Sequence, residues 1–288
     1  MPDESDSRFG EDGLPHYELA YRDEDFLARD ELRPVRLQLE LLKPELVMQE
    51  HEVSSTIVVF GSARIPAPEE AEKRRAAAER RADENPDSEE ARAELERFRR
   101  RCDLSRYYEE ARRFGRIVSD YCQVCSPYEL VITTGGGPGI MEAANRGASE
   151  VGAKTIGLNI EIEREQVPNP YVSPELNFIF QYFALRKMHL LGRAKALAIF
   201  PGGFGTLDEL FETLTLIQTG VMDPIPVVLV GPDYWNDVLD LDALVRGGTI
   251  DSGDRDLVAV AEDAEGAWDV ILDTYPEIRD MHRAAVSD

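Results

Sequence analysis

The feature that most constrains the fold is a regular alternation between short apolar segments and longer amphipathic segments from residue 54 onward. The apolar segments, such as TIVVF, ELVITT and ALAIF, lack polar alternation, and segments with apolar residues at helical spacing follow them. Continuous apolar strands between amphipathic helices are typical of a parallel sheet that helices cover on both faces. We therefore predict an α/β protein with a doubly wound, mostly parallel sheet, a Rossmann-like three-layer sandwich.

The expected elements follow one another in a simple order. Strands are expected within residues 56–60, 129–137, 154–160, 177–183, 196–200 and 226–231. Helices are expected within residues 107–122, 139–152, 184–194 and 206–220, and a closing strand and helix within 253–271. The helices come between the strands, as crossover connections in a parallel sheet require.

The first 50 residues differ from this pattern, so we expect an N-terminal arm and helix over 1–50 and the Rossmann-like domain over 51–288. Residues 1 to about 30 are polar and charged, which favours a loosely draped arm. Val35, Leu39, Leu42 and Leu46 recur at helical spacing and predict a helix, which Pro44 should bend or break.

The segment from about 66 to 104 is rich in Ala, Glu and Arg and almost free of β-forming residues. Favourable i,i+4 pairs of Glu with Lys or Arg and the turn sequence NPDSEE predict a helical hairpin inserted after the first strand. Its arginines could form a patch for an acidic ligand. Because acidic residues nearly balance them, a solvated helix surface is the favoured interpretation.

The charge of the chain limits its partners. A formal net charge of -24 at pH 7 gives a strongly anionic surface, which repels nucleic acid and anionic membranes. The N-terminus is acidic where a signal peptide would be basic and then apolar, and no apolar run has the length of a membrane span. We expect a cytoplasmic protein with no nucleic-acid or membrane partner.

The sequence predicts no metal site. Cys122 and Cys125 have the spacing of half a zinc site, but Cys102 is the only other cysteine, and the four histidines are scattered. We interpret the cysteines as structural or bystander thiols.

Three predicted strands end in glycine-rich loops: FGSA at 60–63, TTGGGPGIME at 133–142 and FPGGFGTLDE at 200–209. Ligands of doubly wound sheets bind beyond the carboxyl ends of the strands. Glycine lets backbone N–H groups approach a ligand, and a helix that starts directly afterwards favours an anion such as phosphate. A steric need for glycine at the turn could explain any one loop, but three together indicate an anion site.

The glycine loops match no standard nucleotide fingerprint. GGGPGI lacks the G-x-G-x-x-G spacing, and no G-x-x-x-x-G-K-[ST] sequence occurs. A dinucleotide dehydrogenase and a P-loop ATPase are therefore disfavoured, and a nucleoside monophosphate or a sugar phosphate fits better.

The segment PGGFGTLDE resembles the P-G-G-x-G-T-x-x-E motif of the LOG family, the cytokinin-activating phosphoribohydrolases that are often mislabelled lysine decarboxylases. GGGPGIME resembles the upstream glycine loop of that family, and LRKM stands where the family carries an Arg-Lys pair. The resemblance covers roughly residues 54–235. The N-terminal arm, the inserted hairpin and ALRKMH, where many members have Met-His before the Arg-Lys pair, depart from the family pattern.

The resemblance implies hydrolysis of the N-glycosidic bond of AMP or N6-prenylated AMP to the free base and ribose 5-phosphate, without a cofactor. Bond cleavage develops positive charge at C1′, which a carboxylate can stabilise. We assign Glu209 to this catalytic role and expect Asp208 and Glu212 to point elsewhere. Arg186 is the second catalytic candidate, since a guanidinium supplies fixed positive charge beside the substrate.

We expect the remaining residues of the three loops and the neighbouring helices to bind substrate. These residues are Gly61, Ser62, Gly135, Gly136, Gly137, Gly139, Met141, Glu142, Lys187, Gly202, Gly203, Gly205, Thr206 and Thr215. Thr215 stands where the family has a substrate-contacting threonine, although a helical threonine often bonds its own backbone.

Two classes of function stay open: the AMP hydrolase, and a non-catalytic nucleotide or cofactor carrier on the same fold. The Arg186 and Glu209 pair favours the hydrolase, since a carrier has no need of it. A true lysine decarboxylase would need a Schiff-base lysine, which no motif provides here. The resemblance and the apolar stripe around Val35 to Leu46 also imply a homo-oligomer, a dimer at minimum or a hexamer of dimer units.

Overall fold

The computed structural model describes residues 19–125, 129–162 and 167–279. Contacts between residues divide the chain into two compact units, residues 1–43 and residues 44–288. Residues 1–18 of the predicted N-terminal arm lie outside the described residues. Two of the four histidines, His16 and His282, therefore have no described position.

The first unit is built from short helical elements: α1 (Glu24–Ala28), a 3₁₀ turn (Asp30–Leu32) and the start of α2 (Arg33–Glu50). The carboxylate of Asp23 caps α1 by accepting a hydrogen bond from the Phe26 N–H at 2.8 Å. Arg36 Nη1 donates to the carbonyl of Leu27 at 2.6 Å and to that of Arg29 at 2.8 Å, which ties the elements together. The predicted break at Pro44 is wrong, because α2 runs through Pro44 as one helix of 18 residues.

The second unit contains a seven-stranded sheet whose pairings among the described residues are all parallel, in the order β4-β3-β2-β1-β5-β6-β7. The strands are β1 (Thr56–Phe60), β2 (Val131–Thr134), β3 (Thr155–Ile160), β4 (Asn177–Phe180), β5 (Ala194–Ile199), β6 (Val227–Val230) and β7 (Ala259–Ala261). All residues of β1, β2, β3 and β6 are buried, which explains the largely apolar sequences of β1 and β6. The buried polar side chains of β2 and β3 include Thr134, Thr155 and Asn159, which form hydrogen bonds. The doubly wound α/β prediction is confirmed.

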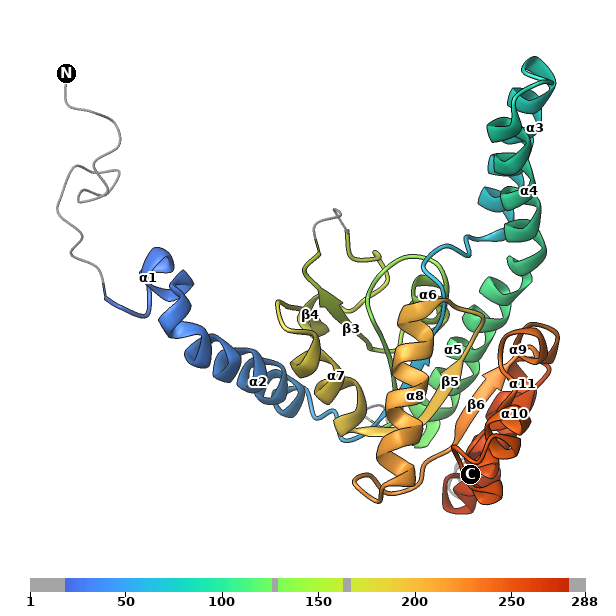
Figure 1. Cartoon of the computed structure of the whole chain (residues 1–288). Helices are drawn as coiled ribbons and strands as arrows, with labels where there is room; N and C mark the ends of the chain where they lie inside the picture. The colour runs from blue at the N-terminus through green and yellow to red at the C-terminus, as the bar shows by residue number, and fades with distance from the viewer. Residues whose placement is uncertain (1–18, 126–128, 163–166, 280–288) are drawn as a thin grey trace, which may run out of the picture. The chain divides into compact units, whose positions relative to one another are not determined.

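Helices cover both faces of the sheet and give the three-layer sandwich (Figure 1). The core on one face joins strand residues to α5 (Arg106–Cys125), α6 (Ile140–Glu150) and α11 (Ala264–Thr274). The core on the other face joins the alternate strand residues to α7 (Phe183–Gly192), α8 (Phe204–Gln218), α9 (Pro232–Val238) and Met48 of α2.

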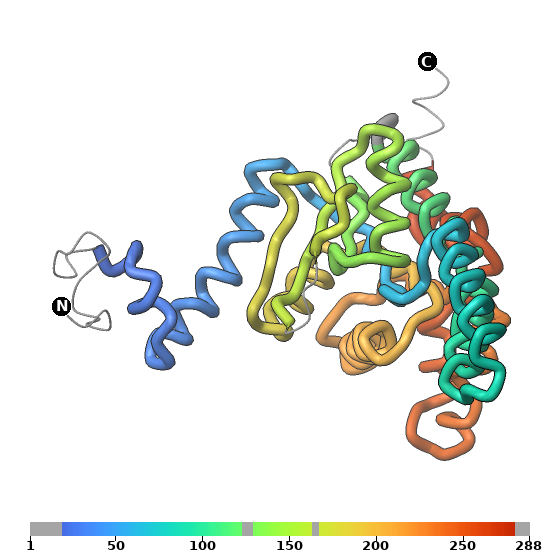
Figure 2. Tube along the Cα trace, turned by 90° about the horizontal axis from the view of Figure 1, so that it is seen from above, coloured from blue at the N-terminus to red at the C-terminus, as the bar shows by residue number. Residues whose placement is uncertain are grey.

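The inserted helical hairpin is also confirmed. It consists of α3 (Pro68–Glu84) and α4 (Glu89–Leu104), which lie side by side and lead into α5 (Figures 1 and 2). Ser88 caps α4 by accepting a hydrogen bond from the Ala91 N–H at 3.2 Å, as the turn sequence predicts. Arg74 pairs with Glu70 at 2.6 Å across one helical turn.

The helices α5 and α6 approach each other closely through two glycines. A Cβ on Gly115 would collide with the carbonyl oxygen of Ala144, and a Cβ on Gly147 would collide with that of Arg112. Since α6 starts directly after the second glycine loop, this contact fixes where that loop lies.

The sequence interpretation did not include the short helices α1, α9 and α10 (Leu241–Arg246) or the 3₁₀ turns Asp30–Leu32, Pro174–Leu176 and Ser252–Leu257. They are too short for an apolar period to develop.

Candidate functional site

The strand order itself defines a crevice. From β1 the chain passes to the hairpin and α5 on one face, whereas from the adjacent β5 it passes to α8 on the other face. Loops that leave neighbouring strands toward opposite faces open a crevice at the carboxyl edge of the sheet. The Ser62 N–H donates to the carbonyl of Pro201 at 3.0 Å, so the two loops also touch.

A cavity of about 790 Å³ lies at this switch point. Its volume is in the upper part of the range of about 300–1,000 Å³ that small-molecule pockets occupy. Ten of the sixteen residues predicted for the site line it: Gly61, Ser62, Gly135, Met141, Arg186, Gly202, Gly203, Gly205, Thr206 and Glu209. The structure thus brings members of all three glycine loops and both catalytic candidates to one cavity.

Arg186 on α7 and Glu209 on α8 form an ion pair inside the cavity wall, with Nη2 of Arg186 at 2.8 Å from Oε1 of Glu209. The two side chains are only 14% and 5% exposed. Arg186 Nε and Glu209 Oε2 are buried and have no hydrogen-bond partner among the described residues. Each partner therefore keeps one buried polar atom whose hydrogen-bonding capacity the described residues do not use.

The environment of Glu209 favours a carboxyl group that exchanges a proton. Burial raises the pKa of Glu209, and the positive charges of Arg186 and Lys187 oppose part of that rise. The effect of burial is the larger one, because water is excluded from a side chain that is nearly covered. A raised pKa together with a specific charge partner in a cavity is typical of functional carboxylates.

The glycines of the site fall into two groups. Gly203 and Gly205 line the cavity, and a Cβ on either would meet no atom within 4 Å, so the packing of the protein does not require glycine there. A Cβ on Gly61 would instead collide with Ile140, and Gly139 has a φ of 74° and would collide with the Ser62 carbonyl. The steric explanation therefore holds for Gly61 and Gly139, and the open loop at 203–205 is the better anion cradle.

Six predicted residues do not line the cavity: Gly136, Gly137, Gly139, Glu142, Lys187 and Thr215. The carbonyls of Gly136 and Gly137 accept hydrogen bonds from Asn169 Nδ2 at 3.1 and 3.0 Å, so this part of the loop is held by the protein itself. Glu142 Oε1 accepts a hydrogen bond from the Tyr108 hydroxyl at 2.8 Å. The substrate contacts assigned to these residues stay predictions that this arrangement does not support.

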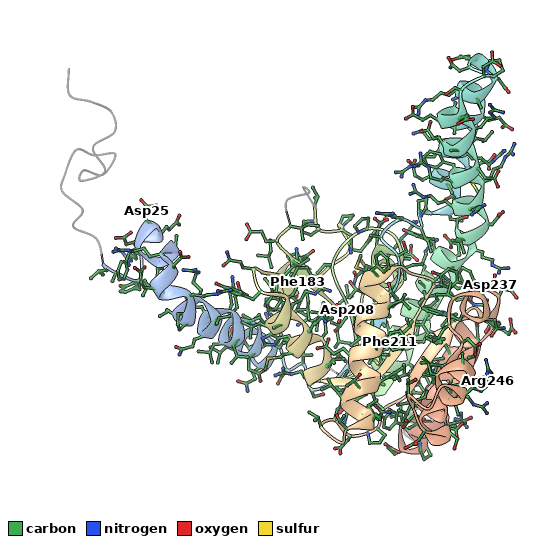
Figure 3. All side chains as sticks on the ribbon, in the orientation of Figure 1. Asp25, Phe183, Asp208, Phe211, Asp237 and Arg246 are labelled. Atoms are coloured by element: carbon green, nitrogen blue, oxygen red, sulfur yellow. The ribbon has the colours of Figure 1, made fainter. Side chains whose placement is uncertain are left out.

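Lys187 lies beside the cavity and is engaged by two acids. Its ammonium group is 2.8 Å from Asp208 Oδ2 and 3.1 Å from Glu212 Oε2, and Figure 3 shows Asp208 on α8 next to α7. Asp208 and Glu212 do not line this cavity, in keeping with the expectation that they point elsewhere, but their ion pairs with Lys187 were not predicted. Thr215 donates to the carbonyl of Phe211 at 2.7 Å, so this threonine does bond its own helix.

Several lining residues were missed in the sequence. Tyr234 of α9 donates from its hydroxyl to the carbonyl of Gly202 at 2.7 Å and thereby holds the loop after β5. Arg64 follows the first glycine loop, and Arg101 comes from the last turn of α4. Only the basic side chain of Arg64 directly after GSA was a usable signal in the sequence.

No cluster of three or more His, Cys, Asp or Glu side chains that could hold a metal occurs in the described part of the chain. The thiol of Cys122 is buried and lies 3.8 Å from the carbonyl oxygen of Leu130, and the side chain of Cys125 lies outside the described residues. Within residues 19–125, 129–162 and 167–279, no helix is long and apolar enough to span a membrane.

The model of a family described as "possible lysine decarboxylase" matches residues 141–271. The cytokinin riboside 5′-monophosphate phosphoribohydrolase LOG3 of Arabidopsis thaliana is 29% identical over 135 residues, which are 46% of this chain and 61% of that protein. The probable phosphoribohydrolase LOG4 of Oryza sativa subsp. japonica is 30% identical over 145 residues, 47% of this chain and 60% of that protein. The chain thus spans about three-fifths of the length of these curated relatives.

Among the solved structures similar to this chain is the molybdenum cofactor binding protein of Rippkaea orientalis, with a TM-score of 0.42 and 19% sequence identity. The match covers 58% of this chain and 87% of the Rippkaea protein. The Moco carrier protein of Chlamydomonas reinhardtii has a TM-score of 0.43 and 19% sequence identity, and the match covers 79% of this chain and 98% of the carrier protein. Likenesses of this extent bear on neither ligand nor activity.

Proposed function

We propose, from the premise that the chain belongs to the LOG family, that it is a hydrolase of nucleoside 5′-monophosphates. Its reaction would be cleavage of the N-glycosidic bond of AMP, or of AMP modified at N6, to the free base and ribose 5-phosphate. The observation that carries the proposal is the buried Arg186–Glu209 pair in the wall of a cavity at the switch point of the sheet.

The loop after β5 suits the 5′-phosphate. It leads into the 15-residue helix α8, and among the described residues no side chain caps the N-terminus of that helix. Free N–H groups at a helix N-terminus favour an anion. Gly203 and Gly205 leave open space toward which backbone N–H groups can reach, and Thr206 adds a hydroxyl in the cavity wall.

The carboxylate of Glu209 suits the bond-breaking step. As the C1′–N9 bond breaks, its electron pair leaves with the base and positive charge grows on C1′ and the ring oxygen, which an adjacent carboxylate stabilises. Water then adds to C1′, and Glu209 accepts the proton that this water loses. The departing base takes up one proton from solvent and protonated Glu209 returns its proton to solvent, so the sum is addition of one water across the bond. The raised pKa of Glu209 makes it a better proton acceptor than an ordinary carboxylate.

Arg186 would keep this carboxylate oriented and ionised before the reaction. Its Nη2 holds Oε1 of Glu209, which leaves Oε2 as the free oxygen for water or C1′. The proposal uses water alone as co-substrate and no cofactor.

The test is incubation of the purified protein with AMP and with N6-isopentenyl-AMP, followed by chromatography for the free base. We expect equimolar base and ribose 5-phosphate, with rates unchanged by EDTA. Loss of activity in EDTA and its return with a divalent ion would contradict the metal-free mechanism. Nucleotide binding without base release would instead favour the alternative, a non-catalytic nucleotide or cofactor carrier.

The assembly and location stay proposals as well. Large apolar side chains are exposed on α7 and α8, among them Phe183 and Phe211, which Figure 3 labels on these neighbouring helices. Leu46 on α2 is also exposed. Such surfaces support a homo-oligomer, a dimer at minimum. The cytoplasmic location rests on the sequence alone.

A further inference from the structure

The cavity has a second positively charged wall that the proposed hydrolysis does not use. Arg64, four residues after β1, and Arg101, in the last turn of α4, both line it. In the described part of the chain, neither guanidinium has a carboxylate within ion-pair distance, whereas the hairpin arginines Arg74, Arg75 and Arg81 all have one. Two unpaired guanidinium groups in one cavity are unusual in a chain with a net charge of -24.

The side chain of Arg101 packs against α4 where it lines the cavity. It is half-buried, and its guanidinium lies 5.4 Å from the ring centroid of Phe98 one turn earlier on α4. The charged groups that act on it most are three other arginines: Arg64, Arg97 and Arg74. Burial and these like charges lower the pKa of Arg101, so a bound anion would relieve a repulsion that is already present.

The two arginines lie next to the expected phosphate loop. The backbone of Ser62, two residues before Arg64, donates to the carbonyl of Pro201, which begins the loop 201–206. The Arg64 N–H in turn donates to Ser62 Oγ at 3.1 Å, which fixes the start of the arginine side chain. Arg64, Arg101 and the loop residues 201–206 line the same cavity, so a group that extends from a phosphate on this loop has both guanidinium groups in the wall around it.

We propose that Arg64 and Arg101 bind a second phosphoryl group, so that the cavity accepts a nucleoside 5′-diphosphate as ligand as well as a 5′-monophosphate. The inference rests on the proposed function for the location of the first phosphate. Guanidinium groups bind phosphoryl oxygens bidentately, which makes arginine the suited residue for a terminal phosphate. The cavity of about 790 Å³ leaves room for the longer ligand. The inserted hairpin thereby becomes an element of ligand specificity.

Calorimetric titration of the full chain with AMP and ADP, without divalent ions, tests this proposal. The Glu209→Gln background is used so that turnover cannot affect the readout, and the binding result then holds whether or not the protein hydrolyses AMP. We expect ADP to bind at least about tenfold more tightly than AMP, the value of one charge-assisted contact. Arg101→Gln should remove most of that advantage and leave AMP binding within about twofold, because only the second phosphoryl group is affected.

Arg100→Gln is the matched control, because it removes the same charge from the adjacent residue of α4, whose side chain is 77% exposed and does not line the cavity. We expect it to keep the preference for ADP, and Arg101→Lys to restore part of it. Equal affinities for AMP and ADP in the background protein would overturn the proposal. Equal weakening of both ligands by Arg101→Gln would also overturn it, since Arg101 would then hold the first phosphate.

Discussion

Replacement of Glu209 by glutamine isolates the charge of one carboxylate in the cavity. Glutamine has nearly the same shape, and its amide oxygen can still accept the 2.8 Å hydrogen bond from Arg186. What disappears is the negative charge beside C1′ and the oxygen that would accept a proton from water. Loss of a general base or of a charge-stabilising group costs about 10²–10⁴ in rate, or about 2.7–5.4 kcal/mol of activation free energy. We expect a loss of kcat within this range and little change in KM.

The stability of the variant separates this effect from damage to the fold. Removal of one partner of a buried ion pair costs up to about 3–5 kcal/mol, but a retained hydrogen bond and the lower desolvation cost of an amide should keep the loss below about 2 kcal/mol. Thermal unfolding and single-turnover kinetics with AMP measure the two quantities. Glu45→Gln is the control, because Glu45 also pairs with an arginine, Arg193, yet does not line the cavity. Wild-type turnover in the Glu209 variant would refute the catalytic role, and a similar loss in the Glu45 control would mean that stability, not chemistry, sets the rate.

Three further predictions concern pH, the phosphate and assembly. The proposed mechanism needs Glu209 in its ionised form, and burial raises the pKa of this carboxyl group. We therefore expect kcat to fall as the pH is lowered through a midpoint above the ordinary value of 4.5, and a midpoint at or below 4.5 in a pH–rate profile would contradict the effect of burial. Adenosine should have a kcat/KM at least about 10² below that of AMP, because the backbone N–H groups of the loop would stay without a phosphate to bind. Gly203→Ala should lower kcat/KM for AMP more than for adenosine. Equal kcat/KM values for the two substrates would mean that the loop serves the fold and does not bind phosphate. Light scattering should find a dimer or a larger oligomer for the full chain and a smaller species for a variant that lacks residues 1–43. This boundary keeps the buried Met48 in the shortened variant. A monomeric full chain would refute the proposed assembly, and an unchanged oligomer in the variant would exclude residues 1–43 as its cause.

The strands were predictable because their signal is local. A strand buried on both faces is mostly apolar, so the bounds of β1 could be read from TIVVF alone. The helix α9 shows the opposite case. It has seven residues and depends on a tertiary contact, since Trp235 is buried and donates from Nε1 to the carbonyl of Val230 at 3.1 Å. The sequence of this helix alone does not predict that contact.

Within the site, the direction of each helical side chain was the part that the sequence could not supply. Met141 lines the cavity, whereas Glu142 points to Tyr108, and Arg186 lines it, whereas Lys187 turns toward Asp208. Neighbouring residues of a helix point about 100° apart, so a motif that contains both cannot say which one faces the ligand. Arg101 was missed for a different reason, because only the tertiary fold brings the end of the inserted hairpin to the cavity.

The glycine contact between α5 and α6 has a consequence for protein engineering. Because Gly115 and Gly147 bring the two backbones together without room for a methyl group, the helices form one stiff block that joins the end of the hairpin to the second glycine loop. Residues 85–87, in the turn between α3 and α4, are exposed and lie at the end of the hairpin away from α5, so we expect changes there to leave this block unaffected. That turn is accordingly the place to attach a fluorophore or an immobilisation tether while the cavity at the carboxyl edge of the sheet stays undisturbed.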